Sequence, residues 1–567
     1  MKRKTLATGA AAIGLAAVMM LGGCGKSAGS QTGANTTSNE SKASEDGTKD
    51  SSKSAGAEGQ ETITVAVQMN EKGEYSDQNY AIRWLEEQTG VNLEFVALPS
   101  DAADADTKLN LMLSSGDYPD VICYNLNKQK MVKFGKEGIF IPINDLYEKY
   151  GNNMKKMFAD RPQYEQNAYA PDGNMYGFPT ASESYHGQAY PKLWYNSEWL
   201  KSLNLSEPTT TEELKEVLTA VKNSDYNGNG KADEIPLTGS PDWDCQLEWY
   251  LMNSFIPCDK ESLSYAKDGK VIFAGDKPEF KEGLAYMHDL FQNGLIDPTA
   301  FSQKSDQMQQ VIHSDEKLVF GYTADHFAMG IDLENKHLNE ITNAMVPVDG
   351  PTGARYQPHK DYIDMTKGFN WFITDECKNP ELAFKVGDFI MGDEASMVMM
   401  YGEKGKYWGD LEKPVESILP GTEAIYWIKP GYTSNENDEY NKNTFWTGLE
   451  NQMAEFRSSM NPLPEDMYVS TSYEARLYEE TEKVVGYFYK EYLPRQIFLE
   501  EDADAEQFAT LQTSLQEYVK TSMAQFITGE LSLDKDWDTY VSTLQSYNVE
   551  TYTQLYQKAY DLYSKAR

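Results

Sequence analysis

Short hydrophobic runs alternate with amphipathic segments from residue 62 onward, and no other feature of the sequence restricts the fold as strongly. The runs TITVAV and VNLEFV have the β-branched content and length of buried strands. The segment between them places Ile82 and Leu85 on one helical face and ends at Gly90, a typical residue after a helix. The expected order is strand 62–67, helix 79–89, strand 91–96, helix 104–114 and strand 121–123. This order predicts an α/β fold with parallel strands.

The same pattern returns further along the chain. Two overlapping capping-box patterns, Thr209 with Glu212 and Thr210 with Glu213, predict the start of a helix. Further strands are expected at 193–195, 317–322 and 369–374, and further helices at 197–203 and 380–391. The C-terminal part is helix-rich with many tyrosines, and no short solenoid repeat is present in the sequence.

The N-terminus has the parts of an export signal. A basic start at residues 2–4 precedes an apolar, alanine-rich run at residues 6–21, which is short for a bilayer-spanning helix. The run ends in Leu-Gly-Gly followed by Cys24. This segment resembles the lipobox of bacterial lipoproteins, in which cleavage leaves the cysteine as the lipidated first residue. We therefore expect a signal peptide at 1–23 and acylation (palmitate) of Cys24.

Residues 25–60 predict a tether. The stretch lacks Val, Ile, Leu, Met, Phe, Trp, Tyr and Cys, so it cannot bury enough apolar surface to offset the entropy of ordering. As a flexible chain it would span roughly 30–35 Å. We expect residues 24–60 to hold a folded body off the membrane, which the protein contacts through its N-terminal lipid only.

The net charge limits the possible partners. The chain has 51 Lys and Arg against 88 Asp and Glu, a formal net charge of −37, which repels nucleic acid and anionic membrane surfaces. Its mean hydropathy of −0.61 argues against a multi-pass membrane protein. The 40% hydrophobic content supports a folded core.

The sequence lacks the motifs of several common enzyme classes. HExxH, GxSxG and GxxxxGK[ST] are absent, and the six histidines show no metal-ligand spacing. The absence of CxxC argues against zinc-ribbon and thioredoxin-like sites. Cys245 and Cys258 either pair in an exported protein or remain buried thiols. We therefore do not expect an enzyme.

A family resemblance extends over most of the chain from about residue 61. The segments that carry it are SGDYPDVI (115–122), YGFPTASESYHGQAYPKLWYNSEWLKSLNL (176–205), PTTTEELKEVLTAV (208–221), 368–391, MYGEKGKYW (400–408) and 526–545. They resemble extracellular solute-binding proteins of the family 1 type, the sugar-binding components of ABC importers. The last two segments resemble the large lipid-anchored subgroup that includes alginate-binding proteins.

The resemblance implies a two-lobed periplasmic-binding-protein type II fold, with hinge strands and a ligand cleft between two α/β lobes. The expected first lobe comprises residues 61–185 with 368–410. The expected second lobe comprises residues 186–367 with 411–567.

The sequence DYNGNGKADE at residues 225–234 has the composition of a calcium loop. Side-chain oxygens stand at positions 1, 3 and 5, and Gly230 allows the sharp turn at position 6. The expected ligands are Asp225, Asn227, Asn229, the backbone carbonyl of Lys231, Asp233 and Glu234. Position 12 of an EF-hand is Pro236 here, and the resemblance to the subgroup implies a shortened loop. The expected role of Ca²⁺ is structural, and the alternative is a Gly/Asn turn.

Candidate ligand-binding residues follow strand ends or crossings between the expected lobes. Sugar rings stack on Trp and Tyr, and their hydroxyls bind Asp, Glu, Asn and His. The candidates are Tyr124, Asn127, Glu183, Tyr185, His186, Trp243, Asp244, Asp325, His326, Trp371 and Trp408. The three tryptophans are favoured for stacking because their positions resemble cleft positions of the family. The set contains no Lys or Arg, which favours a neutral oligosaccharide over a uronate polymer.

These features predict a monomeric, lipid-anchored protein on the extracytoplasmic face of the cell membrane. It is expected to capture an oligosaccharide by lobe closure and deliver it to the transmembrane permease subunits of an ABC importer. A glycan-display lipoprotein without transport is the main alternative. A lipid-anchored glycosidase, which needs two suitably spaced carboxylates, is the weaker one.

Overall fold

A computed structural model describes residues 61–70, 72–242, 244–314, 318–327, 330–366, 368–433 and 437–566, all within the compact unit Ser51–Arg567. The predicted signal peptide, Cys24 and the predicted tether lie outside the described residues, as does Trp243.

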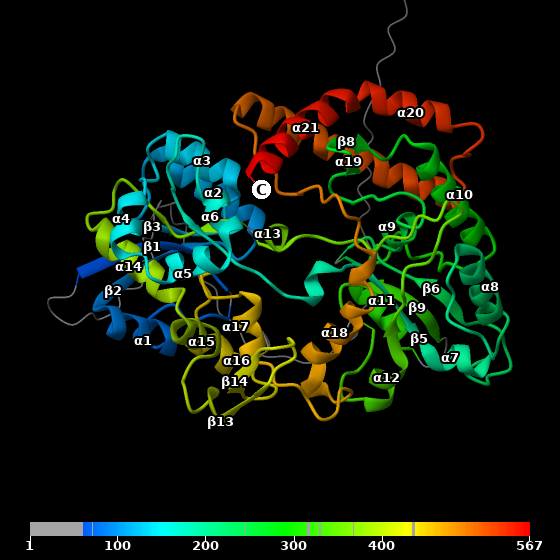
Figure 1. The fold of residues 1–567 in the computed structure, drawn as a ribbon, viewed down its shortest axis with the longest axis horizontal. Helices are drawn as coiled ribbons and strands as arrows, with labels where there is room; N and C mark the ends of the chain where they lie inside the picture. Colours follow the sequence, from blue (N-terminus) through cyan, green and yellow to red (C-terminus); the bar gives the residue numbers. More distant parts are fainter. Residues whose placement is uncertain are drawn as a thin grey trace, which may run out of the picture. The chain divides into compact units, whose positions relative to one another are not determined.

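The first sheet has the parallel strands that the sequence predicts. Its strands, in spatial order, are β12 (Phe372–Ile373), β3 (Val121–Cys123), β1 (Glu61–Gln68) and β2 (Val91–Leu98), with α1 (Tyr80–Thr89) and α2 (Ala102–Ser115) in the connections (Figure 1). Strand β1 pairs in parallel with β2 and β3, and β12 is antiparallel to β3. Asn79 caps the start of α1 and Gly90 ends it at φ 70°. The β-α-β-α-β prediction is confirmed.

The second sheet has one parallel and two antiparallel strand pairs, so it is not the all-parallel repeat that the sequence pattern suggests. Its strands, in spatial order, are β10 (Thr342–Ala344), β5 (Lys192–Asn196), β9 (Val319–Ala324) and β6 (Ile235–Thr238), followed or joined by α7 (Ser197–Ser202) and α8 (Thr211–Lys222). Thr210 caps α8 by accepting the N–H of Glu213, whose carboxylate accepts the N–H and hydroxyl of Thr209. The predicted helix start is confirmed, but Thr209 bonds Glu213 and not Glu212, whose carboxylate accepts the hydroxyl of Thr211.

The strand predicted at 369–374 is interrupted. It forms β11 (Phe369–Asn370), which pairs with β4 (Phe178–Pro179), and then β12, which pairs with β3. The break is at Trp371, whose φ is 54°, in the left-handed region. The turn moves the chain from one sheet to the other.

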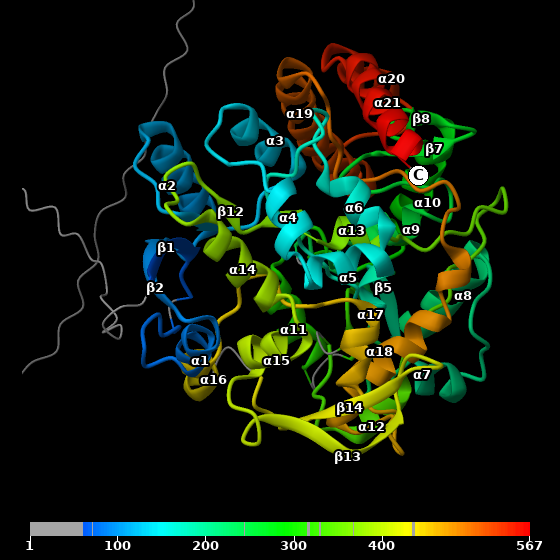
Figure 2. The same ribbon diagram turned by 60° about the vertical axis from the view of Figure 1, so that its left-hand side comes forward.

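The remaining elements cover these sheets or extend from them (Figure 2). Around the first sheet lie α3 (Lys128–Lys136), α4 (Asn144–Tyr150), α5 (Asn153–Asp160), α6 (Pro162–Ala168), α14 (Pro380–Ile390), α15 (Asp393–Tyr401), the hairpin β13 (Trp408–Glu416) and β14 (Glu423–Ile428), α16 (Asp438–Asn443) and α17 (Ala454–Ser459). The other elements are η1 (His186–Gln188), α9 (Leu247–Met252), β7 (Ser264–Lys267), β8 (Lys270–Phe273), α10 (Pro278–Gln292), α11 (Ser305–Ile312), α12 (Lys336–Ile341), α13 (Tyr362–Met365), η3 (Ser470–Ser472), α18 (Tyr473–Glu482), η4 (Val485–Tyr487), α19 (Asp502–Thr528), α20 (Trp537–Ser546) and α21 (Val549–Ala566).

Two large hydrophobic cores form around the sheets. The first core contains buried side chains between Ile63 and Ala181, between Phe369 and Trp408, and between Phe445 and Met460. The second core contains buried side chains between Leu193 and Val348 and between Leu493 and Ala559. The expected lobe boundaries placed residues 411–567 together, whereas the side chains from Phe445 to Met460 pack in the first core. The exact limits of the lobes stay a prediction.

Cys123, Cys245, Cys258 and Cys377 are buried thiols. None of the described helices is both long and apolar enough to span a membrane.

Candidate functional site

Residues 182–192 connect the two cores, and this crossing segment carries a buried ion pair. Glu183 is 1% exposed, and its carboxylate accepts two hydrogen bonds from the Arg161 guanidinium, each 2.9 Å long, and the N–H of Ala454 at 2.9 Å. Arg161 also binds Glu455 at 2.7 Å. Both carboxylate oxygens of Glu183 are therefore used within the protein. Its role in this arrangement is to hold Arg161 and the start of α17 beside the crossing segment.

The next residues of that segment meet α18. His186 Nδ1 lies 3.5 Å from Glu474 Oε2, and Arg457 Nη2 lies 3.8 Å from the same oxygen. At the carboxyl end of β9, His326 Nε2 lies 3.3 Å from Asp325 Oδ1. We call His186, Asp325, His326, Arg457 and Glu474 the charged cluster.

The pKa shifts show that these groups act on one another. Burial would raise the pKa of Glu474, but the hydrogen bond from His186 and the charges of Arg457 and His326 lower it to about 2. Burial lowers the pKa of His326, against the attraction of Asp325. Burial raises the pKa of Asp325, and the nearby charge of Asp244 adds to that rise. The cluster is thus a set of paired charges, and His186, Arg457 and Glu474 line a pocket.

Aromatic rings flank a pocket beside the cluster. The pocket has a volume of about 40 Å³ and is lined by Glu183, Tyr185, His186, Arg457, Glu474 and Tyr478, among others. The rings of Tyr185 and Tyr478 stack with centroids 4.4 Å apart. Burial and a hydrogen bond to Glu482 raise the pKa of Tyr185, so its hydroxyl stays protonated. Paired charges beside a tyrosine pair provide donors, acceptors and a ring surface.

Asp244 lies near the same region but is already engaged. It has a positive φ of 54° and forms an ion pair with Lys260. Its negative charge helps to raise the pKa of Asp325. The structure therefore brings Glu183, Tyr185, His186, Asp244, Asp325 and His326 to one region.

Tyr124 and Asn127 follow β3 as predicted but are engaged elsewhere. Burial and the charge of Asp106 raise the pKa of Tyr124 to about 12. Asn127 is exposed and caps α3 by accepting the N–H of Lys130 at 2.9 Å. Neither contacts the charged cluster. Their roles as ligand contacts stay predictions.

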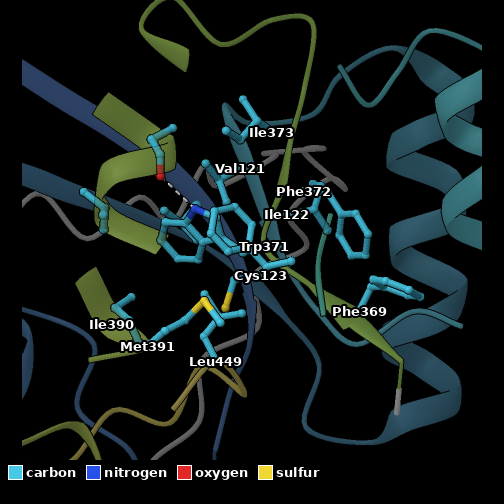
Figure 3. Packing of buried hydrophobic residues seen from close by; sticks show 14 of the residues in the cluster. Val121, Ile122, Cys123, Phe369, Trp371, Phe372, Ile373, Ile390, Met391 and Leu449 are labelled. Carbon is cyan, nitrogen blue, oxygen red and sulfur yellow. Dashed lines mark hydrogen bonds between the residues drawn. The ribbon is translucent and has the colours of Figure 1, made fainter. Parts of the chain in front are cut away.

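Trp371 and Trp408 are core residues, so the prediction that they stack on a ligand is wrong. Their exposed fractions are 1% and 0%. Figure 3 shows the Trp371 indole among the side chains of Val121, Cys123 and Ile390. Its Nε1 donates to the carbonyl of Ala383 at 2.9 Å, and Trp408 Nε1 donates to the carbonyl of Gly402 at 2.8 Å. Neither ring has a face left for a sugar.

Trp446 is an aromatic residue at the first sheet's binding edge that the sequence reasoning missed. It is 48% exposed, and its Nε1 donates to Tyr440 Oη at 2.8 Å. The carbonyl of the next residue, Thr447, accepts hydrogen bonds from Asn370 and from Cys123, the last residue of β3. The indole is therefore held near the carboxyl end of β3, where ligands of parallel sheets bind.

The sequence reasoning also missed the basic partners of the site. Arg161, Arg457 and Lys260 lie among the candidates, which corrects the expectation of a region without Lys or Arg. A buried acid such as Glu183 needs a cation, but its burial is not visible in the sequence. Arg161 is 22 residues from Glu183 and Lys260 is 16 residues from Asp244, and neither spacing corresponds to a known local motif.

The loop at 225–234 has an unsatisfied buried oxygen. Glu234 is 5% exposed, and its Oε1 accepts the N–H groups of Tyr226 at 2.7 Å and Asn227 at 3.2 Å. Its Oε2 is buried without a hydrogen-bond partner. Asp225 Oδ2 accepts the N–H of Gly230, whose φ is 84°. A buried carboxylate oxygen without a donor favours a cation nearby.

The other expected ligands lie in the same turn. Asn229 Oδ1 accepts the N–H of Lys231 at 2.8 Å, and its Nδ2 lies 3.2 Å from Asp233 Oδ1. Among the described residues, no group of three or more His, Cys, Asp and Glu side chains is gathered closely enough to hold a metal ion. The loop adds amide and backbone carbonyl oxygens to its carboxylates, and this all-oxygen donor set fits Ca²⁺.

Comparison with known proteins identifies the family. The sequence profile of the bacterial extracellular solute-binding proteins matches residues 63–397. The chain belongs to this family.

Individual solute-binding proteins extend the comparison. The chain is 28% identical over 489 residues to the fructooligosaccharide ABC transporter substrate-binding protein FusA of Streptococcus pneumoniae, covering 84% of this chain and 86% of FusA. It is 23% identical over 390 residues to the lipoprotein LipO of Bacillus subtilis, covering 64% and 72%. A solved structure of a FusA EF-hand mutant in complex with fructo-nystose matches with a TM-score of 0.69 and 26% identity, covering 89% of this chain and all of that one. This solute-binding protein has the two-lobed α/β fold that the resemblance implies.

Proposed function

We propose that this solute-binding protein captures a neutral oligosaccharide by lobe closure and delivers it to the permease subunits of an ABC importer. The observation that carries the proposal is the paired state of the charges at the site. Arg161, Arg457 and Lys260 each have a carboxylate within ion-pair distance. A ligand without charge can exchange hydrogen bonds with such pairs and leave them intact.

The charge balance argues against an anionic sugar at this site. The carboxylates of Glu183, Glu455, Glu474, Asp325 and Asp244 outnumber the two arginines and the lysine. A uronate would meet net repulsion and would have to break an existing pair to gain one. The similarity to a fructooligosaccharide-binding protein supports the same ligand class, without fixing the sugar or its length.

We assign two aromatic surfaces to ring stacking. Tyr185 and Tyr478 form one, beside the charged cluster. Trp446 forms the other, near the carboxyl end of β3. Stacking on a sugar ring needs an exposed ring face, and Trp446 has one.

We further propose that the loop at 225–234 binds a structural Ca²⁺. The unpartnered Oε2 of Glu234 and the donor set of the loop support this. The similarity to a protein whose described mutant is an EF-hand mutant supports it independently. All the ligands come from one turn remote from the charged cluster in sequence, which is typical of a stabilising ion.

We also propose that Cys24 carries the lipid anchor and that residues 25–60 are the tether. The lipobox-like sequence supports this, as does the similarity to a protein described as a lipoprotein. Replacing Cys24 by alanine should release the mature protein from the membrane fraction into the medium. Retention of the Cys24→Ala protein in the membrane would contradict the proposal.

Calorimetry with a panel of neutral fructooligosaccharides tests the main proposal. Trp446→Ala should weaken binding by about 1–3 kcal/mol, the usual size of ring stacking, without changing the melting temperature by much. Trp408→Phe is the matched control, because a buried tryptophan should affect stability and leave affinity unchanged. Small-angle scattering should detect closure on adding the same ligand. Turnover of the sugar would instead indicate a glycosidase, and binding without closure would favour glycan display.

A further inference from the structure

A second cavity lies away from the charged cluster. It has a volume of about 290 Å³ and is lined by residues of α3, α6, α13 and α21 and of the segment 492–498. We call it the α3–α21 cavity. Ala559 belongs to the second core, and Phe498 packs against the first, so the cavity has walls from both cores. It shares no lining residue with the pocket at Tyr185 and Tyr478.

Lys128 is the unusual group of this cavity. Its Nζ lies 5.4 Å from the ring centroid of Phe498, another lining residue. Within the described residues, no carboxylate lies within ion-pair distance of this ammonium group and no hydrogen bond to it is found. Burial lowers the pKa of Lys128 to about 8, so the group still carries a charge at neutral pH.

The other charged groups of the cavity are already engaged. The carboxylate of Asp364 accepts the hydroxyl of Tyr492 and the N–H groups of Arg495 and Gln496. The Arg495 guanidinium pairs with Asp259. Asp361 accepts the N–H of Ile363 at the start of α13. These contacts leave the Lys128 charge without a counter-charge among the described residues.

Uncharged donors and acceptors complete the lining. The side-chain amides of Gln163, Gln166 and Asn167, all on α6, have no protein partner among the described residues. Each amide offers both a donor and an acceptor, as vicinal hydroxyl groups require. Phe498 and Leu562 supply apolar surface.

We propose that the α3–α21 cavity binds a small hydroxylated carboxylate of the size of a sugar-acid monomer. Lys128 pairs with its carboxylate, the α6 amides bind its hydroxyls, and Phe498 covers its apolar face. The volume suits a single ring. A lone half-buried cation is costly, and a ligand carboxylate removes that cost with a charge-assisted hydrogen bond. Asn127, a predicted oligosaccharide contact, also lines this cavity, but none of the lining residues belongs to the charged cluster or to the pocket beside it.

Calorimetry of the full folded chain with sodium glucuronate at about pH 7 tests the proposal. Glucose, which keeps the ring and hydroxyls but lacks the carboxylate, is the ligand control. Lys128→Met removes the charge and keeps the apolar stem of the side chain. Lys130→Met is the matched protein control, because Lys130 lies on the same helix outside the cavity and pairs with Asp106 at 3.1 Å. Glu474→Gln reports on the oligosaccharide site.

Glucuronate should bind the wild type and the Lys130→Met and Glu474→Gln proteins with similar affinity. Lys128→Met should weaken its binding about tenfold or more, and glucose should bind no variant comparably. Equal glucuronate affinity in wild type and Lys128→Met would overturn the proposal. Loss of glucuronate binding in Glu474→Gln would also overturn it, because glucuronate would then bind at the oligosaccharide site. The absence of any glucuronate binding would overturn it as well. Failure of oligosaccharide binding in the Trp446→Ala experiment leaves these readouts unaffected.

Discussion

Replacing Gly387 by alanine provides a direct test of Trp371 as a core residue. Gly387 lies in α14, and a Cβ atom there would be 2.7 Å from Trp371 Cδ1 and 2.8 Å from Trp371 Nε1. Contacts this short force a shift of the indole, which costs about 1–3 kcal/mol as overpacking. Alanine gains about 1 kcal/mol over glycine in a helix, so the net loss for Gly387→Ala is about 0–2 kcal/mol.

Trp371→Phe is the complementary change. It removes the Nε1 hydrogen bond to the Ala383 carbonyl and empties part of the indole volume, for a loss of about 2–3 kcal/mol. A phenyl ring keeps carbons near the positions of Cδ1 and Nε1, the atoms that a Cβ at Gly387 would meet, but it can move away from that Cβ into the space left by the fused benzene ring. The double variant should therefore be more stable than the sum of the single losses predicts, by about 1 kcal/mol or more. Phe178 Cζ, at 3.1 Å from the same Cβ position, limits the recovery.

Urea unfolding of the wild type, both single variants and the double variant measures this coupling. Changes that add to within about 0.5 kcal/mol would refute the packing argument, because independent sites are additive. Calorimetry of Trp371→Phe with the best oligosaccharide adds a second readout. A stable Trp371→Phe protein with weakened sugar binding would indicate that Trp371 contacts the ligand.

Three further predictions follow from the site and its surroundings. Chelation should lower the melting temperature of the wild type, with Ca²⁺ restoring it better than Mg²⁺, whereas the Asp225→Ala protein should respond to neither; a wild type indifferent to confirmed metal removal would contradict the calcium site. Burial and the charge of Arg495 lower the pKa of His359 to about 4 from the ordinary 6.5, so protonation favours the unfolded chain. Lowering the pH from 7 to 4 should therefore cost up to about 3 kcal/mol of stability, measured by urea unfolding, and His359→Gln should lack this loss. Oligosaccharide affinity measured by calorimetry should change little between low and moderate salt, since stacking on Trp446 involves no charge; steep weakening would indicate a charged ligand.

The parts of the fold that depend on local pattern could be predicted from the sequence. The parallel strands β1, β2 and β3 have the β-branched runs of buried strands, and Gly90 supplies the positive φ that ends α1. The break at Trp371 could not be predicted, because its backbone conformation depends on the contact with Gly387 and on two different partner strands. A continuous hydrophobic run predicts one strand, and the pattern does not show whether its two halves pair with different strands.

The candidate site divides in the same way. His186, Asp325 and His326 could be selected because they follow strands or crossings in an α/β chain. Arg457 and Glu474 could not, because the contact between α18 and the crossing segment joins residues almost 300 positions apart. Aromatic residues were the weakest part of the prediction, since composition and position do not distinguish a buried indole from an exposed one.

The two proposed sites differ in whether their charged side chains are already paired within the protein. In the charged cluster, burying Arg457 or Glu474 without a partner would cost several kcal/mol, so each is held by an opposite charge before any ligand arrives. This surface presents hydrogen-bonding atoms but no unpaired cation. It therefore favours a ligand with hydroxyl groups over a ligand with a carboxylate. In the α3–α21 cavity, Lys128 lies over Phe498 without a carboxylate among the described residues, so the ligand itself must bring the counter-charge. A chain with a net charge of −37 repels anions at long range, so an anionic ligand gains affinity only where a cation remains unpaired at short range.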